Sequence, residues 1–312
     1  MDWIKNALQE ICKDTAENFP LSYITSLKTG GPARFFVSPY NTEEIKKILD
    51  VCRRYNLPLL VVGKGTNLLI SDKGFDGVVI STKNLNKIQA ENNTIYCQAG
   101  VLLSAVLKTC IVKSLKGLEF LSGIPGTAGG AVISNAGLKK EWISEKIVSV
   151  DVISLVDIKE LTLPKEDITF GYRTCRLEGY FIAGVLFRPE KGKREKIKMA
   201  IADYMKKRIK TQPLEYPSAG SVFKNPPGLF AGMLIEKCGL KGYSIGGASI
   251  SDKHANFIIN KGNATSEDIY KIICKVKEEV KRVYNIKLET EIKIIGSFGG
   301  EKNEDSGTLW WR

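Results

Sequence analysis

The stretch of sequence that most restricts the fold runs from Gly117 to Ala131 and contains five glycines and one proline. Glycine is unfavourable inside helices and strands, and proline cannot donate a backbone hydrogen bond, so we expect an irregular loop here. A loop with so few side chains can press its backbone against a flat or phosphorylated ligand. A glycine-rich structural crossover without a ligand is the alternative interpretation.

A second glycine loop follows an expected buried strand at residues 59–62 and reads Gly63-Lys64-Gly65-Thr66-Asn67. Glycines directly after a strand allow backbone N–H groups to approach a phosphate and donate to it. The loop is not a P-loop, because Lys64 is followed by glycine instead of serine or threonine. It also lacks the third glycine of a dinucleotide-binding fingerprint. Taken alone, it fits an ordinary tight turn equally well.

Helices and strands are interleaved along the chain without a regular strand–helix–strand repeat, which predicts an α+β fold. The first 19 residues are expected to form a short amphipathic helix. Further helices are expected at about 42–55, 102–112 and 191–210, within 228–239, and after the capping pair Thr265 and Asp268. Strands are expected at 59–62, 77–81, 94–98, 147–155, 160–163, 181–187 and 291–295.

The chain is basic, with 46 Lys and Arg against 34 Asp and Glu, a net charge of +12. The positive charges are spread along the chain, which suits a substrate and cofactors that carry phosphates. The densest basic run, 191–210, has helical spacing and is interpreted as a solvated helix face. A nucleic-acid-binding module is an alternative class of function, but no clustered aromatic and basic face supports it.

Residue usage also excludes some kinds of site. The seven cysteines are scattered and form no C-x-x-C pair, which indicates reduced thiols without a disulfide framework or zinc site. With His254 as the only histidine, a Ser-His-Asp triad is not expected. No apolar run approaches the roughly 20 residues that span a bilayer, and the N-terminus does not resemble a signal peptide. We therefore expect a cytoplasmic protein.

The two glycine loops, in this order and at this separation, resemble the UDP-N-acetylenolpyruvoylglucosamine reductase (MurB) family. The resemblance covers about residues 21–296. The short segment between Phe187 and Pro217 resembles the subtype that lacks a substrate-capping insertion. Further matching segments are Thr29-Gly30-Gly31-Pro32-Ala33, Asn135-Ala136-Gly137, Phe170-Gly171-Tyr172-Arg173, residues 217–226, His254-Ala255-Asn256-Phe257 and residues 288–292.

The resemblance implies a two-part FAD-binding domain of the PCMH/vanillyl-alcohol-oxidase type, followed by a smaller α+β substrate-binding domain. The implied division is an N-terminal helix (1–20), the FAD-binding domain (21–190, with subdomains of about 21–85 and 86–190), a connecting helix (191–210), the substrate domain (211–298) and a disordered tail (299–312).

The resemblance also implies the reaction. NADPH is the co-substrate, FAD is bound non-covalently, and UDP-N-acetylglucosamine enolpyruvate is reduced to UDP-N-acetylmuramate for peptidoglycan synthesis. The protein is expected to be a monomer without metal, membrane or nucleic-acid partners. The expected FAD-binding residues are Gly63, Lys64, Gly65, Thr66, Asn67, Ser122, Gly123, Ile124, Pro125, Gly126, Thr127, Gly129 and Gly130.

Three residues are expected to be catalytic by their place in the family pattern. Arg173 can hold the substrate carboxylate with two hydrogen bonds while negative charge develops. Ser221 is the implied proton donor, and Glu291 would assist the serine or hydrogen-bond the enolate. Without the motifs, Arg173 would be assigned to a surface salt bridge and Ser221 to a turn. Glu289 and Glu291 share one face of the expected strand, so periodicity cannot choose between them.

Four residues are expected to bind the substrate: Tyr172, Lys224, Asn225 and His254. An ammonium, an amide and a ring nitrogen can all donate to diphosphate oxygens. For His254, a core or turn role is an equally good interpretation.

The chain departs from the family pattern at Cys175, usually serine, at Thr290, usually proline, and at residues 138–141, which lack an aromatic-glycine pair. These departures leave open a paralogue of the family with an altered substrate. A separate alternative is a different FAD oxidoreductase with the same flavin domain, acting on another hydroxy or enol acid. The presence of Arg173, Ser221 and Glu291 together argues against it.

Overall fold

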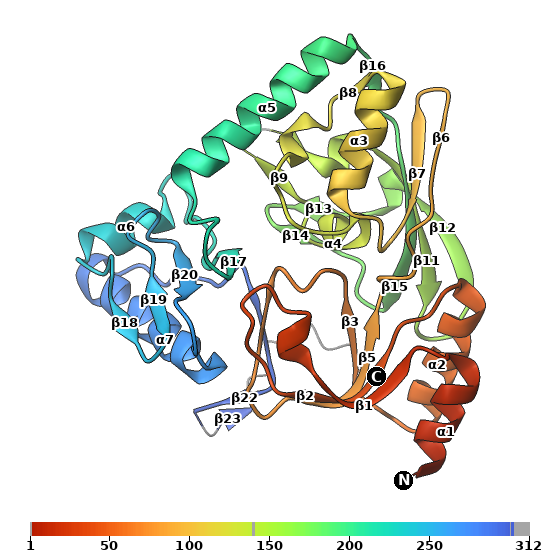
Figure 1. Ribbon diagram of the computed structural model, residues 1–312, viewed down its shortest axis with the longest axis horizontal. Helices are drawn as coiled ribbons and strands as arrows, with labels where there is room; N and C mark the ends of the chain where they lie inside the picture. The colour runs from red at the N-terminus through yellow and green to blue at the C-terminus, as the bar shows by residue number, and fades with distance from the viewer. Residues whose placement is uncertain (1, 139–140, 300, 303–312) are drawn as a thin grey trace.

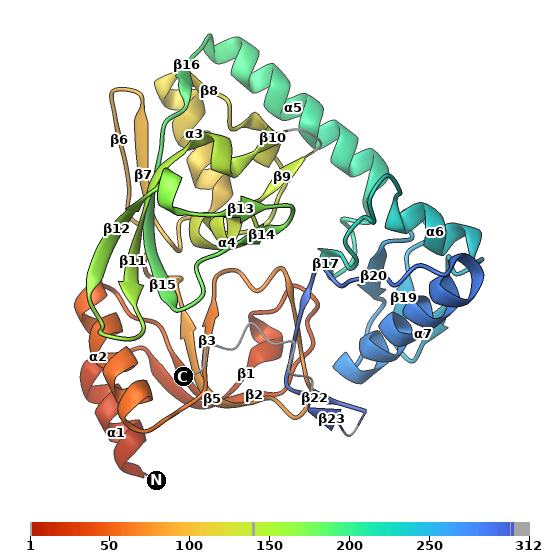
Figure 2. The same cartoon turned by 180° about the vertical axis from the view of Figure 1, so that it is seen from behind.

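The computed structural model describes residues 2–138, 141–299 and 301–302, and it has the α+β architecture predicted from the sequence (Figure 1). The first part of the chain forms two sheets. Helix α5 (Arg194–Thr211), which runs along one side of the molecule, connects this part to a smaller C-terminal unit. Figure 2 shows the same arrangement from behind. Within the described ranges, no helix combines the length and the apolar character that crossing a membrane requires.

The first sheet has the strand order β1-β2-β5-β3, in which β2, β5 and β3 are parallel and β1 is an antiparallel edge strand. Two helices pack on this sheet through apolar faces that include Leu8 and Ile48. Asn41 caps the second helix by accepting a hydrogen bond from the backbone N–H of Glu44 (2.9 Å). The bounds are α1 Asp2–Ile11, β1 Thr15–Pro20, β2 Pro32–Val37, α2 Thr42–Arg54, β3 Leu59–Val62 and β5 Phe75–Ser81.

The N-terminal helix is shorter than predicted. Helix α1 ends at Ile11, and the hydroxyl of Thr15 donates to the carbonyl groups of Cys12 (2.6 Å) and Leu8 (3.3 Å). The bond to Cys12 satisfies a carbonyl just past the end of the helix, and the bond to Leu8 adds to the one that its carbonyl accepts from the N–H of Cys12. The chain then forms β1, which pairs with β2. The prediction of a helix over the first 19 residues is therefore wrong beyond Ile11.

The second sheet has the order β12-β11-β15-β7-β6 and is antiparallel throughout. Helix α3 packs beside it, and the two share a core that includes Val106, Val150 and Phe187. The strands fall close to their predicted positions. The bounds are β6 Ile88–Glu91, β7 Thr94–Gln98, α3 Leu103–Lys113, β11 Ile147–Ser154, β12 Glu160–Pro164 and β15 Tyr180–Phe187.

The glycine-rich stretch is not wholly irregular, because a short helix, α4, occupies Ala128–Ile133. The side chain of Thr127 caps this helix by accepting from the N–H of Gly130 (3.3 Å). A Cβ atom at Gly129 would lie 2.9 Å from the Cβ of Ala99, so glycine permits the helix to approach that neighbour. Tertiary packing outweighs low helix propensity here, and the prediction of no regular structure is wrong over this turn and a half.

The C-terminal unit has a four-stranded sheet of order β17-β20-β19-β18 with α6 and α7 packed beside it. Thr265 and Asp268 form the predicted capping box at the start of α7. Its elements are β17 Ser218–Ser221, α6 Ala231–Lys237, β18 Ser244–Ile245, β19 Ala248–Ile250, β20 Phe257–Asn260 and α7 Ser266–Tyr284. The remaining short elements are η1 Leu21–Tyr23, β8 Leu115–Lys116, η2 Glu119–Leu121, β9 Gly137–Leu138, β10 Glu141–Trp142, η3 Ile143–Lys146, η4 Lys165–Asp167, β13 Phe170–Gly171, β14 Thr174–Cys175 and β16 Glu190–Lys191.

The chain returns from the C-terminal unit to the first part of the fold. Strand β21 (Lys293–Ile295) pairs in parallel with β4 (Leu68–Ile70). The carboxylate of Asp72 accepts from the N–H groups of Ser266 (2.9 Å) and Glu267 (3.0 Å) at the start of α7. These contacts hold the C-terminal unit against the segment that follows the first glycine loop.

The predicted disordered tail is wrong at its start, because β23 (Glu301–Lys302) pairs with β22 (Ser297–Phe298) in a short hairpin. The rest of the predicted tail, 303–312, lies outside the described residues.

Candidate active site

The two glycine loops meet although they are about 60 residues apart in the sequence. The hydroxyl of Thr66 donates to the carbonyl of Pro125 (2.8 Å). A Cβ atom at Gly63 would lie 2.5 Å from Oγ1 of Thr127, and one at Gly65 would lie 2.3 Å from the carbonyl oxygen of Ile24. Gly65 also has a positive φ of 63°. Both positions therefore require glycine, and the loops form one surface.

The first loop has the donors that a phosphate needs. None of the backbone N–H groups of residues 63–67 donates to another residue in the part of the chain that the structure describes. Unpaired N–H groups in a glycine loop after a strand are a common site for phosphate oxygens. The residues of this loop therefore fit the diphosphate of a flavin dinucleotide.

Arg173 is held by three kinds of contact. Its Nη1 donates to the carbonyl of Gly137 (2.9 Å), and its Nε lies 2.9 Å from Oε1 of Glu291. Its guanidinium carbon lies 5.6 Å from the ring centre of Trp142 and 5.7 Å from that of Tyr172. Cation–π contacts of this kind fix the plane of a guanidinium. Arg173 itself has a positive φ of 57°.

Trp142 is a site residue that the sequence interpretation missed. Its ring packs edge-on to Tyr172, with ring centres 5.9 Å apart, and it flanks Arg173. It lies just after the segment that departs from the family pattern, of which residues 139–140 lie outside the described ranges. The sequence did offer one sign of this role, because Trp142 follows closely after the second glycine loop.

The structure separates the two glutamates that periodicity could not distinguish. The side chain of Glu291 is 20% exposed and faces Arg173, whereas that of Glu289 is 73% exposed and pairs with Lys224 (3.3 Å). The strand begins only at Lys293, so the prediction that both glutamates share a strand face is wrong. Burial raises the pKa of Glu291, while the charges of Arg173 and Lys224 oppose that rise.

Ser221 ends β17, directly after Gly220, which has a positive φ of 77°. An irregularity in the pairing of β17 with β20 falls between Ser218 and Ser221. Such irregularities turn a side chain away from its regular direction. The segment that follows runs beside Glu291, whose N–H donates to the carbonyl of Val222 (2.7 Å). The serine and the glutamate therefore come from adjacent backbone segments.

The first glycine loop joins the same group of segments. The Nδ2 of Asn67 donates to the carbonyl of Glu291 (3.2 Å), and the carbonyl of Asn67 accepts from the N–H of Lys293 (2.9 Å). The structure thus brings together the cofactor loop, the partly buried Glu291 and, through that glutamate, Arg173.

The expected substrate-binding residues lie along one side of this group. The hydroxyl of Tyr172 accepts from the N–H of Asn225 (3.4 Å), and the Oδ1 of Asn225 accepts from the N–H of Ala231 (3.0 Å). Tyr172 is exposed, and Lys224 is engaged with Glu289 as described above. These side chains leave part of their hydrogen-bonding capacity for a ligand.

His254 is less available than the other three. Its Nδ1 accepts from the N–H of Asn256 (3.2 Å), and its ring packs against Phe257 with centres 4.8 Å apart. Burial lowers its pKa, which favours the neutral ring. Only Nε2 is left to donate to a ligand, and the turn role weighed from the sequence is present in the structure.

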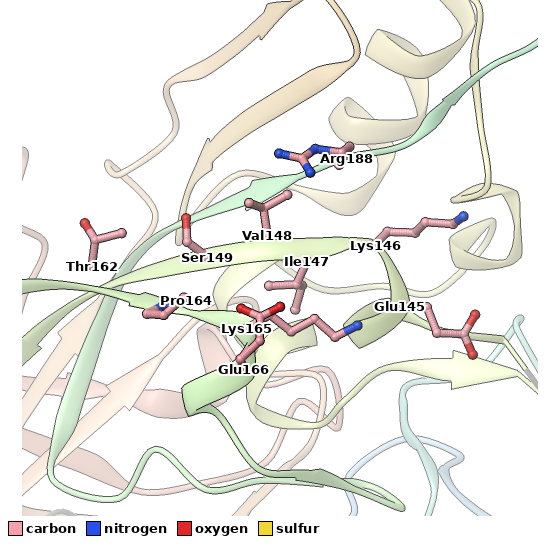
Figure 3. Close-up of a pocket in the computed structure, with 10 residues that line it drawn as sticks. All are labelled: Glu145, Lys146, Ile147, Val148, Ser149, Thr162, Pro164, Lys165, Glu166 and Arg188. Atoms are coloured by element: carbon pink, nitrogen blue, oxygen red, sulfur yellow. The ribbon is translucent and has the colours of Figure 1, made fainter.

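The cavity shown in Figure 3 has a volume of about 550 Å³ and lies elsewhere, against β11, β12 and η3. It contains none of the predicted site residues. Its lining mixes the cations Lys146, Lys165 and Arg188 with the carboxylates Glu145 and Glu166. We assign the site by the convergence of the two glycine loops with the Arg173–Glu291 pair, because the lining of this cavity contains no glycine loop that could hold a phosphate.

Cys175, one of the departures from the family pattern, lies behind the site. It is buried, and burial raises the pKa of its thiol to about 12. It therefore behaves as a small apolar residue. Thr290, a second departure, forms an isolated β-bridge with Phe223 and so takes part in the backbone pairing beside Glu291.

Comparison with known proteins first defines the class. Residues 33–155, which include both glycine loops, match a family described as FAD binding domain. Residues 212–295 match a family described as UDP-N-acetylenolpyruvoylglucosamine reductase, C-terminal domain. The fold and the site are thus those of an FAD-binding protein with a reductase C-terminal domain.

Relatives over nearly the whole chain define the particular family. The UDP-N-acetylenolpyruvoylglucosamine reductase of Clostridium novyi (strain NT) is 43% identical over 286 residues, covering 91% of this chain and 93% of that protein. The protein of the same name from Clostridium tetani (strain Massachusetts / E88) is 41% identical over 298 residues, covering 95% and 97%. The chain belongs to the UDP-N-acetylenolpyruvoylglucosamine reductase family, and the resemblance predicted from the sequence is confirmed.

A solved structure agrees with this assignment. The UDP-N-acetylenolpyruvylglucosamine reductase (MurB) from Thermus caldophilus superposes with a TM-score of 0.78 at 33% identity, covering 90% of this chain and 98% of that one.

Proposed function

We propose that this chain reduces UDP-N-acetylglucosamine enolpyruvate to UDP-N-acetylmuramate with NADPH and FAD, in the synthesis of peptidoglycan precursors. The observation that carries the proposal is the partly buried Arg173–Glu291 pair, which the side-chain amide of Asn67 links to the first glycine loop through the carbonyl of Glu291. Family membership supports the same reaction.

FAD is held by the two glycine loops, Gly63–Asn67 through unpaired backbone N–H groups and Ser122–Gly130 through its bare backbone. When bound there, FAD would supply the redox chemistry, a hydride that comes from NADPH and goes to the vinyl CH2 group of the substrate. The loops contribute by excluding water and by holding the phosphates of the cofactor. Non-covalent binding is expected, because His254, the only histidine, lies in the C-terminal unit.

Arg173 acts on the negative charge of the substrate. Hydride addition to the vinyl carbon forms a new C–H bond and moves the electron pair of the double bond toward the carboxylate. A guanidinium already fixed by Gly137 and Trp142 can stabilise that charge without rearranging. This contact becomes stronger as the charge develops, so it lowers the barrier of the second half-reaction.

Ser221 and Glu291 complete the reaction at the adjacent carbon. Ser221 gives its hydroxyl proton to that carbon, which forms the lactyl ether and leaves an alkoxide to be reprotonated from solvent. A serine is a weak acid, so a nearby protonated carboxyl group assists by hydrogen bonding to the enolate or the serine. The raised pKa of Glu291 suits it for that role.

The UDP diphosphate binds along the side formed by Tyr172, Lys224, Asn225 and His254. The ammonium group of Lys224 can leave its exposed partner Glu289 and bind phosphate oxygens instead, because an exposed ion pair contributes little free energy. Tyr172 and Asn225 are already in contact, so a ligand that touches one orders the other.

The protein is proposed to act in the cytoplasm as a monomer. Nucleotide sugars and NADPH are compounds of that compartment. Gel filtration with light scattering tests the oligomeric state.

The experiment that tests the function is to incubate the purified protein with NADPH and the enolpyruvyl substrate and to identify the product by mass spectrometry. The expected product is heavier than the substrate by two hydrogens. Flavin that remains in the pellet after acid precipitation would contradict non-covalent binding. Oxidation of NADPH without substrate reduction would contradict the proposed function.

A further inference from the structure

Arg208 on α5 is a cation without an anion. It is half-buried, its Nε is fully buried without a hydrogen-bond partner, and its Nη1 donates to the neutral amide of Gln212 (3.2 Å). In the described part of the chain, no carboxylate lies within 4.0 Å of its guanidinium. Burial lowers its pKa, and the positive charge of Arg173 lowers it further. A guanidinium in such a place is unfavourable unless a ligand supplies the counter-charge.

The stem of Arg208 packs on the second glycine loop. A Cβ atom at Gly123 would lie 2.7 Å from the Cδ of Arg208 and 3.2 Å from the sulfur of Met205, so only glycine admits this packing. One residue earlier, the hydroxyl of Ser122 donates to the carbonyl of Ile201 (3.0 Å). Helix α5 is therefore attached to the cofactor loop along two turns, beyond its expected role as a connector.

Arg208 thus lies between two parts of the site. Its stem contacts a loop assigned to FAD, and the charge of Arg173 is close enough to lower the pKa of Arg208. Arg173 already has the carboxylate of Glu291 as a partner, whereas Arg208 has no carboxylate partner among the residues that the structure describes. An anion placed against the loop would stabilise Arg208 and relieve the repulsion between the two arginines.

We infer that Arg208 is a cofactor-binding residue that donates its unpaired N–H groups to an anionic group of FAD. The inference rests on the proposed function, because it takes the loop around Gly123 to be the FAD loop. FAD offers two anions, its diphosphate and the pyrimidine edge of its ring, which becomes negatively charged when the flavin is reduced. A guanidinium can form two parallel hydrogen bonds with either group.

The test compares Arg208→Gln and Arg208→Lys with Lys206→Gln, all as the holoenzyme. Lys206 is an exposed residue of the same helix, so its variant removes an equal charge without touching the loop. FAD released on dilution is followed by flavin fluorescence, and the midpoint potential of the bound flavin is measured by dye equilibration. The KM for the enolpyruvyl substrate is measured in parallel.

Arg208→Gln should release FAD with a dissociation constant at least about tenfold higher than that of Lys206→Gln, the effect of losing a charged hydrogen bond. If the anion is the diphosphate, the binding of oxidised FAD and that of reduced FAD weaken equally, and the midpoint potential stays unchanged. If the anion is the reduced ring, the reduced form weakens more, and each additional tenfold lowers the potential by about 30 mV. Either result supports the inference. Arg208→Lys should fall between wild type and Arg208→Gln, and it serves as the test if the glutamine variant does not fold.

Two results would overturn the inference. One is that Arg208→Gln retains FAD and its potential as well as Lys206→Gln does. The other is a rise in substrate KM alone, which would assign Arg208 to the substrate. A wild-type protein that binds no flavin would instead refute the proposed function itself, so the two failures are distinguishable.

Discussion

Replacing Arg173 by lysine keeps the positive charge of the site but removes the planar fork that the surrounding residues hold. In the structure Nη1 donates to Gly137 while Nε, on another edge of the guanidinium, faces Glu291. A single ammonium cannot occupy both positions, and it cannot stack its plane against Trp142. The charge would remain near the substrate carboxylate, but its position and the directions of its hydrogen bonds would not be fixed.

The expected loss is that of a misplaced oxyanion donor, about 100-fold or more in the rate of the substrate half-reaction. A 100-fold loss corresponds to about 2.7 kcal/mol of transition-state stabilisation. Binding of the substrate should weaken much less, because Tyr172, Lys224 and Asn225 are untouched. Reduction of the flavin by NADPH should change little, since no negative charge develops at Arg173 in that step.

Stopped-flow measurement of flavin absorbance separates the two steps. Bleaching with NADPH reports the first half-reaction, and the return of colour after mixing reduced enzyme with the enolpyruvyl substrate reports the second. Arg176→Lys is the matched control, because Arg176 is an exposed arginine of the same segment. Equal losses in both half-reactions of Arg173→Lys would indicate a folding defect. A wild-type rate in the second half-reaction would refute the assigned role.

Three further predictions concern the same half-reaction. Ser221→Ala should accept electrons from NADPH at a near-normal rate but reoxidise very slowly, and Ser221→Cys should retain more activity because a thiol is a stronger acid; fast reoxidation of the alanine variant would make Ser221 a turn residue. The protonated fraction of Glu291 falls as pH increases, so the reoxidation rate should fall with rising pH, and because burial raises the pKa of Glu291 the midpoint should lie above that of an ordinary glutamate. That descending limb should be absent in Glu291→Gln, and its persistence would assign it to another group. Trp142→Leu should slow reoxidation about tenfold through the lost cation–π contact, whereas Trp142→Phe should lose less, with thermal melting separating this effect from instability.

Elements with strong local signals were predictable from the sequence alone. Strands β3 and β7 were predicted at their observed ends, and the capping pair Thr265 and Asp268 marked the start of α7. Helix α5 was predicted within three residues of its observed bounds, and most of its basic side chains are exposed as expected. In each case a few neighbouring residues determine the outcome, so no knowledge of the tertiary structure is needed.

The misses all depend on tertiary contacts. Residues 15–20 form a strand because β2 is available to pair with them, and this pairing cannot be predicted from their composition. Helix α4 exists because Gly129 fits against Ala99. Glu289 and Glu291 differ in exposure and in ion-pair partner, because one lies next to Lys224 and the other next to Arg173. Arg173 comes from a segment more than a hundred residues earlier. The role of Arg208 could not be predicted either, because a basic helix face is normally exposed to solvent and only the structure shows a loop packed against it.

The position of Glu291 also explains how one arginine can serve two carboxyl groups. If Glu291 were ionised, Arg173 would be neutralised before the substrate arrived, and the substrate carboxylate would meet a negative neighbour. Burial works against that state by raising the pKa of Glu291. Binding of the substrate carboxylate beside Arg173 adds a second negative charge and so favours a proton on Glu291 still further. The substrate thereby helps to protonate the acid that assists its own reduction. Because the backbone of Glu291 is bonded to both Val222 and Asn67, the proton is held where the serine segment and the cofactor loop meet.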